Sequence, residues 1–191
     1  MTTDKTQTTQ VDKSLKKGRR SRRGMQMSEA LLILGGIAIV LAIIIGLYSM
    51  VMTGWRNMQT TQLVMRTASV VETSYRSFAT YDNGTLLPVI KNRGEFTDKE
   101  IYVSGSNTLM RSPFNTNMTV VGDGARNFTI TVTDLQPGPC EKLLEAMVDP
   151  GRRVFGASVN GTAMTVPFNN TAIASACSGA SDDFYDVAIT F

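Results

Sequence analysis

The chain has 191 residues, of which 42% are hydrophobic, and a net charge of +3. Without its unusual N-terminal stretch, that length suits one domain of ordinary size with a sizeable core. Residues 1–24 hold eight basic and two acidic side chains, a net of +6, whereas residues 25–191 hold 11 basic and 14 acidic side chains, a net of −3. The basic character therefore belongs to the tail, and no nucleic-acid partner is expected for the folded part.

The residue types that catalysis and metal binding most often use are scarce. The sequence has no histidine, which is the commonest general base and metal ligand, and it has no Gly-x-Ser-x-Gly or phosphate-loop motif. We therefore expect no enzymatic activity, no metal and no other cofactor. Two cysteines, Cys140 and Cys177, lie late in the chain. An even pair in an exported chain favours one disulfide, with two buried free thiols as the alternative.

An uncharged apolar segment follows the basic tail. Residues 1–23 are polar and show no apolar periodicity, so we expect them to be disordered and cytoplasmic. Residues 30–52 are 23 residues without a charge, and a helix needs roughly 20 to cross a bilayer. Seven basic residues lie just before this segment and none follows until Arg56. The positive-inside rule then places the N-terminus in the cytoplasm and the rest of the chain outside.

The helix is expected to continue beyond the apolar segment. Between residues 55 and 79, apolar side chains recur at helical spacing on one face: Val64, Ala68, Val71, Tyr75 and Phe78. Asn83 and Gly84 end the pattern. This predicts one helix of about 50 residues, roughly 75 Å long at 1.5 Å per residue. Its first half is apolar all round, and its second half needs a domain to cover the apolar face.

The rest of the chain predicts an antiparallel sheet. The clearest strand is 127–133, where Phe128, Ile130 and Val132 alternate with threonines, and a turn at 122–124 would join it to a strand at 118–121. Other expected elements are loops with short elements in 80–116, a helix at 140–148, strands at 154–159 and 164–168, and a C-terminal strand over 187–191. We therefore predict an α+β fold, with one long helix packed on the sheet.

The start of the apolar segment carries the most specific signal. Residues 22–29 read Arg-Arg-Gly-Met-Gln-Met-Ser-Glu, and the uncharged segment begins directly after them. Gly24 has no side chain and is easily extended into a protease cleft. Glu29 is a charge at the start of an apolar helix, and a carboxylate left unpaired in hydrocarbon is costly, so a partner is expected. A plain signal anchor with an incidental glycine and glutamate is the alternative.

This arrangement resembles the precursors of bacterial type IV pilins, which carry a basic leader ending in glycine and a hydrophobic helix with glutamate at its fifth position. The resemblance implies that prepilin peptidase removes a leader, residues 1–24, by cutting between Gly24 and Met25, and that Met25 is then N-methylated. It also implies a salt bridge during assembly between Glu29 and the α-amine released at Met25 of a neighbouring subunit. The mature chain would comprise a hydrophobic transmembrane and filament-core helix, residues 25–54, and a globular domain, residues 55–191.

Later segments narrow the resemblance to the type IVb branch, which includes the toxin-coregulated, bundle-forming and conjugative thin-pilus pilins. A 24-residue leader, a methionine at the cut and the segments 112–118 and 128–135 are similar to that group. Cys140 and Cys177 match the pair that bounds the family's C-terminal D-region. The resemblance implies a major structural subunit, held in the inner membrane and then polymerised with other copies into an extracellular filament.

The implied partners are other copies of the chain, prepilin peptidase, the inner-membrane assembly platform and, before assembly, the lipid bilayer. Adhesion, aggregation and conjugative mating are the roles that the resemblance offers for the filament. A minor pilin or a pseudopilin of a related assembly or secretion system is the nearest alternative. An anchored enzyme and a monomeric anchored binding module are the alternatives from other classes, and neither requires Glu29.

Overall fold

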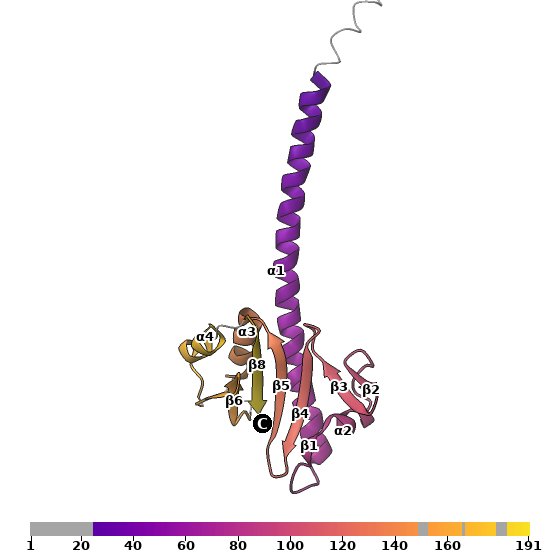
Figure 1. Ribbon diagram of the computed structural model, residues 1–191, viewed down its shortest axis with the longest axis vertical. Coiled ribbons are helices and arrows are strands. Elements are labelled where there is room, and N and C mark those ends of the chain that lie inside the picture. The colour runs from indigo at the N-terminus through magenta and orange to yellow at the C-terminus, as the bar shows by residue number, and fades with distance from the viewer. Residues whose placement is uncertain (1–24, 149–152, 166, 179–182) are drawn as a thin grey trace, which may run out of the picture. The chain divides into compact units, whose positions relative to one another are not determined.

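The computed structural model describes residues 25–148, 153–165, 167–178 and 183–191, with the backbone alone for residues 25–29. The chain divides into two compact units, Met1–Met50 and Val51–Phe191. The described part of the first unit belongs to helix α1 (Met25–Tyr75). The second unit, which we call the head, holds the rest of α1 and all the other elements in the described ranges (Figure 1).

In the head, the C-terminal part of α1 buries one face. The face combines apolar residues with two threonines that were not part of the predicted pattern: Thr60, Leu63, Val64, Thr67, Ala68, Val71 and Tyr75. The threonine hydroxyls donate to helix carbonyls one turn earlier, Thr60 to Arg56 at 2.9 Å and Thr67 to Leu63 at 2.7 Å. Because these bonds satisfy the hydroxyls, the threonines can lie in the core at little cost.

Helix α1 ends at Tyr75, four residues before the predicted end. Phe78, which the sequence pattern placed on the buried face, is 68% exposed, so that part of the prediction is wrong. The chain turns back here because the Tyr75 ring packs on the Tyr81 ring, with 5.2 Å between centroids. The Tyr81 N–H then donates to the Ala125 carbonyl at 2.8 Å. Aromatic packing and a tertiary hydrogen bond thus outweigh the local periodicity.

The strands in the described residues form one antiparallel sheet of eight strands, in the order β2-β3-β4-β5-β8-β6-β7, with β1 paired to β4. The C-terminal strand β8 lies between β5 and β6. The strands are β1 (Asn83–Thr85), β2 (Ile101–Ser104), β3 (Asn107–Arg111), β4 (Asn117–Asp123), β5 (Phe128–Leu135), β6 (Gly156–Val159), β7 (Thr162–Met164) and β8 (Tyr185–Thr190). The α+β fold class is therefore as predicted.

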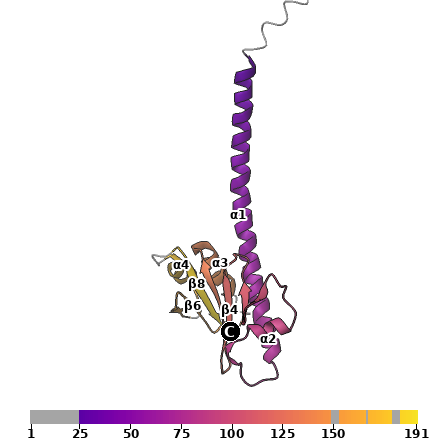
Figure 2. The same cartoon turned by 45° about the vertical axis from the view of Figure 1, so that its right-hand side comes forward.

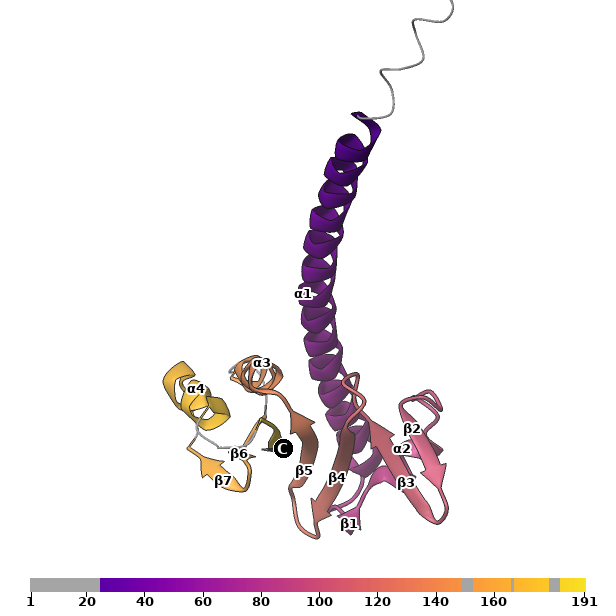
Figure 3. The same cartoon turned by 45° about the horizontal axis from the view of Figure 1, so that its top comes forward.

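One face of the central strands supplies the core. Alternate residues of β4, β5 and β8 are buried, which is the pattern of a sheet with one covered face: Met118 and Val120, then Phe128, Ile130 and Val132, then Tyr185, Val187 and Ile189. The C-terminal part of α1 lies along β4 and β5 on this face (Figure 1, Figure 3). The predicted hairpin of β4 and β5 is confirmed, with Met118 opposite Val132.

Three short helices complete the described part of the head. They are α2 (Leu87–Asn92), α3 (Pro137–Met147) and α4 (Asn170–Ser178). Figure 2 shows α2 close to the C-terminal end of α1. The predicted helix at 140–148 corresponds to α3, which begins three residues earlier because a proline at the first helical position supports a helix start. Helix α4 and the β2–β3 hairpin had no counterpart in the sequence analysis.

The strand predicted at 164–168 is wrong. Strand β7 ends at Met164, and it pairs with β6 through a tight turn at Asn160 and Gly161, whose φ angles are 48° and 76°. Two left-handed residues in succession are the signature of a two-residue hairpin turn. Beyond Met164, Pro167 lacks the N–H that a strand would need, and Phe168 is buried outside any strand.

We predict that Gly122→Ala destabilises the head by about 1–3 kcal/mol, because an added methyl group has no room. A Cβ at this position of β4 would lie 2.2 Å from the backbone oxygen of Asp82. Thermal or urea unfolding of the full-length chain in detergent measures the change. Gly156→Ala in β6 is the matched control, because a Cβ there meets nothing within 4 Å. Equal stability of the two variants would contradict the close approach.

Candidate functional site: the apolar helix and the head

The N-terminal half of α1 exposes apolar side chains all round. From Leu31 to Met50, the large hydrophobic side chains are between 51% and 77% exposed. A window of 18 residues in this helix has a mean hydropathy of 3.0, and none of it is buried. Among the described residues, α1 is the one helix that is long and apolar enough to cross a membrane. An apolar surface of this extent is typical of a segment that lipid or other chains cover.

The predicted processing and assembly residues lie at the start of this helix. Gly24 lies outside the described residues, whereas Met25 and Glu29 are the first and fifth residues of α1. Four residues span about one turn, or roughly 6 Å, so Met25 and Glu29 share a helix face. The cut at Gly24, the methylation of Met25 and the salt bridge of Glu29 stay predictions.

A disulfide joins Cys140 to Cys177, in agreement with the single disulfide expected from the sequence. Cys140 is the fourth residue of α3 and Cys177 the next to last residue of α4, and their Cα atoms lie 5.9 Å apart. Both cysteines are fully buried. Helices α3 and α4 therefore lie side by side (Figure 1, Figure 3). The covalent bond attaches the C-terminal region to the core of the head.

An arginine of α1 holds the segment between α2 and β2. The Arg66 guanidinium donates to the Glu95 carbonyl, forms an ion pair with Glu100 at 3.4 Å and lies 4.3 Å above the centre of the Phe96 ring. Glu100 also accepts hydrogen bonds from the Thr97 N–H at 2.8 Å and from its hydroxyl at 2.9 Å. Burial alone would raise the pKa of Glu100, but these hydrogen bonds and Arg66 lower it. Sequence reasoning missed this cluster, because its members are far apart in the chain.

Aromatic rings form a second cluster at the end of the head where α1 stops. Tyr81 lies between Tyr75 and Phe128, with centroid distances of 5.2 and 5.0 Å, and Phe128 stacks on Phe191 at 5.4 Å. The Tyr75 hydroxyl donates to the Asp82 carboxylate. Burial raises the pKa of Tyr81, and the nearby charges of Glu72 and Asp123 raise it further. The Tyr81 hydroxyl therefore remains protonated and available as a donor at neutral pH.

In the described ranges, no group of three or more Cys, Asp or Glu side chains is arranged to hold a metal ion.

We predict that replacing both cysteines, by Cys140→Ala with Cys177→Ala, lowers the free energy of unfolding by about 2–4 kcal/mol, because the bond closes a long loop. The sequence separation is 37 residues. Denaturant unfolding of the full-length chain in detergent measures the loss. The wild-type chain in reducing agent should unfold at the same denaturant concentration as the double variant. An unchanged midpoint in both samples would show that packing alone holds α4.

No family model matches the chain, and no curated protein is significantly similar to it in sequence. The similarity appears among solved structures. TcpA, a type IV pilin from Vibrio cholerae El Tor biotype, superposes with a TM-score of 0.53 at 15% identity, covering 72% of this chain and 99% of TcpA. A type IVb pilin from Salmonella typhi superposes with a TM-score of 0.52 at 16% identity, covering 71% of this chain and 93% of the pilin. With its long apolar N-terminal helix, antiparallel sheet and Cys140–Cys177 disulfide, the chain has the type IV pilin fold.

Proposed function

We propose that this chain is the precursor of a major structural subunit of a bacterial type IVb pilus. The observation that carries the proposal is the division within α1. Residues 31–51 expose apolar side chains in every direction, whereas residues 60–75 of the same helix bury a face in a head with the pilin fold. A subunit that passes from a bilayer into a filament needs both parts.

The apolar half of α1 must be shielded from water both in the membrane and in the filament. Each fully buried Leu or Ile side chain is worth about 1.5–3 kcal/mol relative to water, so a stretch this long does not stay in water. Lipid of the inner membrane covers it before assembly, with the N-terminus in the cytoplasm as the basic leader directs. In the extracellular filament, the α1 helices of other copies replace the lipid. The inner-membrane assembly platform would move the subunit from the lipid bilayer into the filament.

Processing prepares the N-terminus for this exchange. Prepilin peptidase on the cytoplasmic side would cut between Gly24 and Met25, removing a leader with a net charge of +6. The new α-amine of Met25, which is then methylated, can pair with Glu29 of a neighbouring copy. A charge left unpaired among apolar helices is costly. Pairing two opposite charges in the filament core relieves that cost and sets the stagger between neighbouring helices.

The head would form the filament surface and carry its contacts in adhesion, aggregation or conjugative mating. The disulfide between α3 and α4 supports the type IVb assignment over a pseudopilin, and the role is structural, not catalytic. A minor pilin or a pseudopilin of a related secretion system is the alternative. Abundance separates them, because a minor subunit would be scarce in sheared filaments.

The mass of the protein in sheared surface filaments tests the processing step. We expect a chain that begins at Met25 and carries one added methyl group, because the leader is removed before assembly. Intact-protein mass spectrometry, with fragmentation from the N-terminus, gives the answer. A chain that keeps residues 1–24 in the filament, or that begins elsewhere, would contradict the proposed cut.

We predict that Glu29→Val leaves membrane insertion intact but abolishes surface filaments, because the α-amine of the neighbouring subunit loses its partner. Membrane fractionation measures insertion, and electron microscopy with quantification of sheared protein measures assembly. Asp98→Val is the control, since it also removes one carboxylate but from an exposed side chain of the head. Normal filaments from Glu29→Val would exclude the salt bridge as a requirement for assembly.

A further inference from the structure

A groove opens beside the aromatic cluster of the head, in the region where α1 ends. It has a volume of about 670 Å³. We call it the aromatic groove and define it by six of its lining residues: Arg76, Tyr81, Arg126, Arg153, Phe155 and Phe191. A smaller hollow of about 150 Å³ shares Tyr81 and Arg126 with it and adds Phe78. The two hollows are therefore neighbours, and aromatic rings and guanidinium groups line both.

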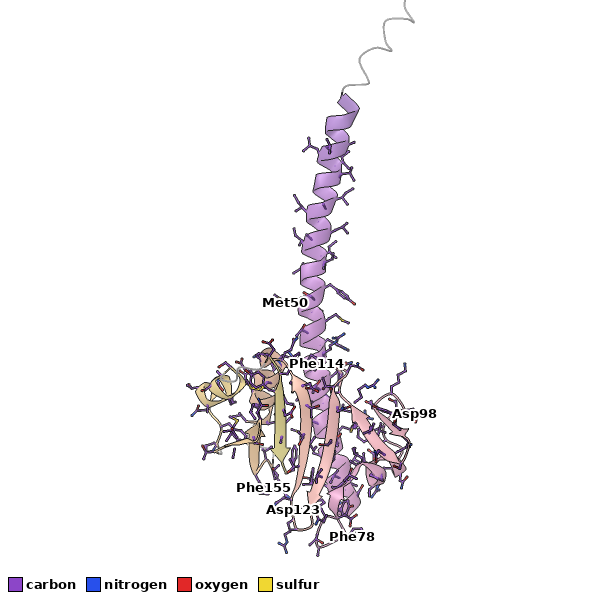
Figure 4. The ribbon with its side chains drawn as sticks, viewed as in Figure 1. Met50, Phe78, Asp98, Phe114, Asp123 and Phe155 are labelled. Atoms are coloured by element: carbon purple, nitrogen blue, oxygen red, sulfur yellow. A yellow bond between two sulfur atoms is a disulfide. The ribbon has the colours of Figure 1, made fainter. Side chains whose placement is uncertain are left out.

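The aromatic groove offers ring faces to solvent. Phe155 is 65% exposed and Phe78 is 68% exposed, whereas the rings beneath them are buried or half-buried. Figure 4 shows both phenylalanines at the same end of the head, with Asp123 near them. Phe155 lines the aromatic groove and Phe78 the smaller hollow, and each leaves ring surface that the described part of the head does not cover. Flat apolar surfaces of this kind suit a ligand that has a flat apolar face of its own.

Within the described residues, three arginines of the groove form no ion pair with a carboxylate. The ion pairs in the described part of the head are Arg66–Glu100 and Lys142–Glu145, and neither includes a groove residue. Arg76 follows the end of α1, Arg126 lies between β4 and β5, and Arg153 precedes β6. All three are exposed. A guanidinium presents a rigid fork of donors that fits a carboxylate in a bidentate pair, so the groove favours an anionic group.

Neutral and acidic hydrogen-bonding groups complete the lining. Glu72, Thr73 and Asn127 face the groove together with the arginines. The nearby Asp123 carboxylate is already occupied, since it accepts the N–H groups of Ala125 at 2.7 Å and Asn127 at 3.2 Å. A ligand with one carboxylate and several hydroxyl groups would find a partner for each kind of group here.

We propose that the aromatic groove binds an acidic sugar residue, a sialic or uronic acid at the end of a glycan chain. The carboxylate pairs with the guanidinium of Arg126 or Arg153. The apolar face of the sugar ring lies on Phe155, and the hydroxyl groups bond to Glu72, Thr73 and Asn127. This inference goes beyond the filament role and does not depend on it, because every residue involved belongs to the head.

A polyphosphate such as single-stranded DNA fits these charges less well. Residues 25–191 carry a net charge of −3, Glu72 lines the groove, and Asp82 and Asp123 lie close to the groove tyrosines Tyr75 and Tyr81. Nucleic-acid sites on proteins are strongly positive, because affinity comes mainly from neutralising many phosphates. A single carboxylate can pair with the guanidinium of one arginine. The acidic side chains nearby repel its one charge less than they repel the many charges of a polyphosphate.

The test uses the full-length chain in detergent micelles with sialyllactose as the probe and lactose as the neutral comparison. Saturation-transfer NMR should show magnetisation reaching the sialic acid ring, with binding at least about tenfold tighter than for lactose. Equal signals from the two sugars would overturn the proposal. Tighter, salt-dependent binding of a thymidine oligonucleotide would also overturn it and assign the groove to nucleic acid.

Variants locate the site. Arg126→Gln and Phe155→Ala should each weaken sialyllactose binding at least about fivefold. The first variant removes the guanidinium that pairs with the carboxylate, and the second removes the ring on which the sugar lies. Both side chains are exposed, and melting curves verify that each variant is folded. Arg93→Gln removes an exposed arginine outside the groove and should bind as the wild type does. Unchanged binding by both groove variants would overturn the proposal, and the filament tests would be unaffected.

Discussion

The structure depends on helix α1, whose two halves require different surroundings. Over residues 31–51, α1 has no polar face, so neither orientation nor bending can remove its apolar surface from water. Over residues 60–75, the helix has one buried face and one exposed face, and Val64 and Val71 are fully buried in the head. The boundary between the two patterns determines where the head begins, and the contacts that the apolar half needs must come from outside the chain.

The elements with strong local periodicity were predictable from the sequence. Alternation in β5 and β8 indicated the correct faces, because a period of two over five or more residues is typical of a strand with one buried face. Helix α4 was missed because most of its nine residues are small or polar, with little apolar contrast around the helix. Its one clear signal was the cap, where Asn169 accepts the N–H of Ala172 at 2.7 Å.

The contacts that arise from tertiary packing were not predictable in this way. Arg66 and Glu100 are separated by 34 residues, and the aromatic groove takes its members from α1, the β4–β5 turn, the approach to β6 and the C-terminus. A charge or a phenylalanine at such a position looks like any other surface residue in the sequence. The disulfide was the exception, since two cysteines in the whole chain allow only one intramolecular pairing.

The disulfide also explains how a poorly packed helix stays attached to the head. Among its described residues, α4 buries Ile173 and Cys177, which is little apolar area for an element of nine residues. A bond to α3, whose Leu143, Leu144 and Met147 are all buried, replaces the missing hydrophobic contact with a covalent one. The exposed side chains of α4 are then not needed to hold the helix on the head. A surface helix held in this way can change its outward residues without loss of the fold.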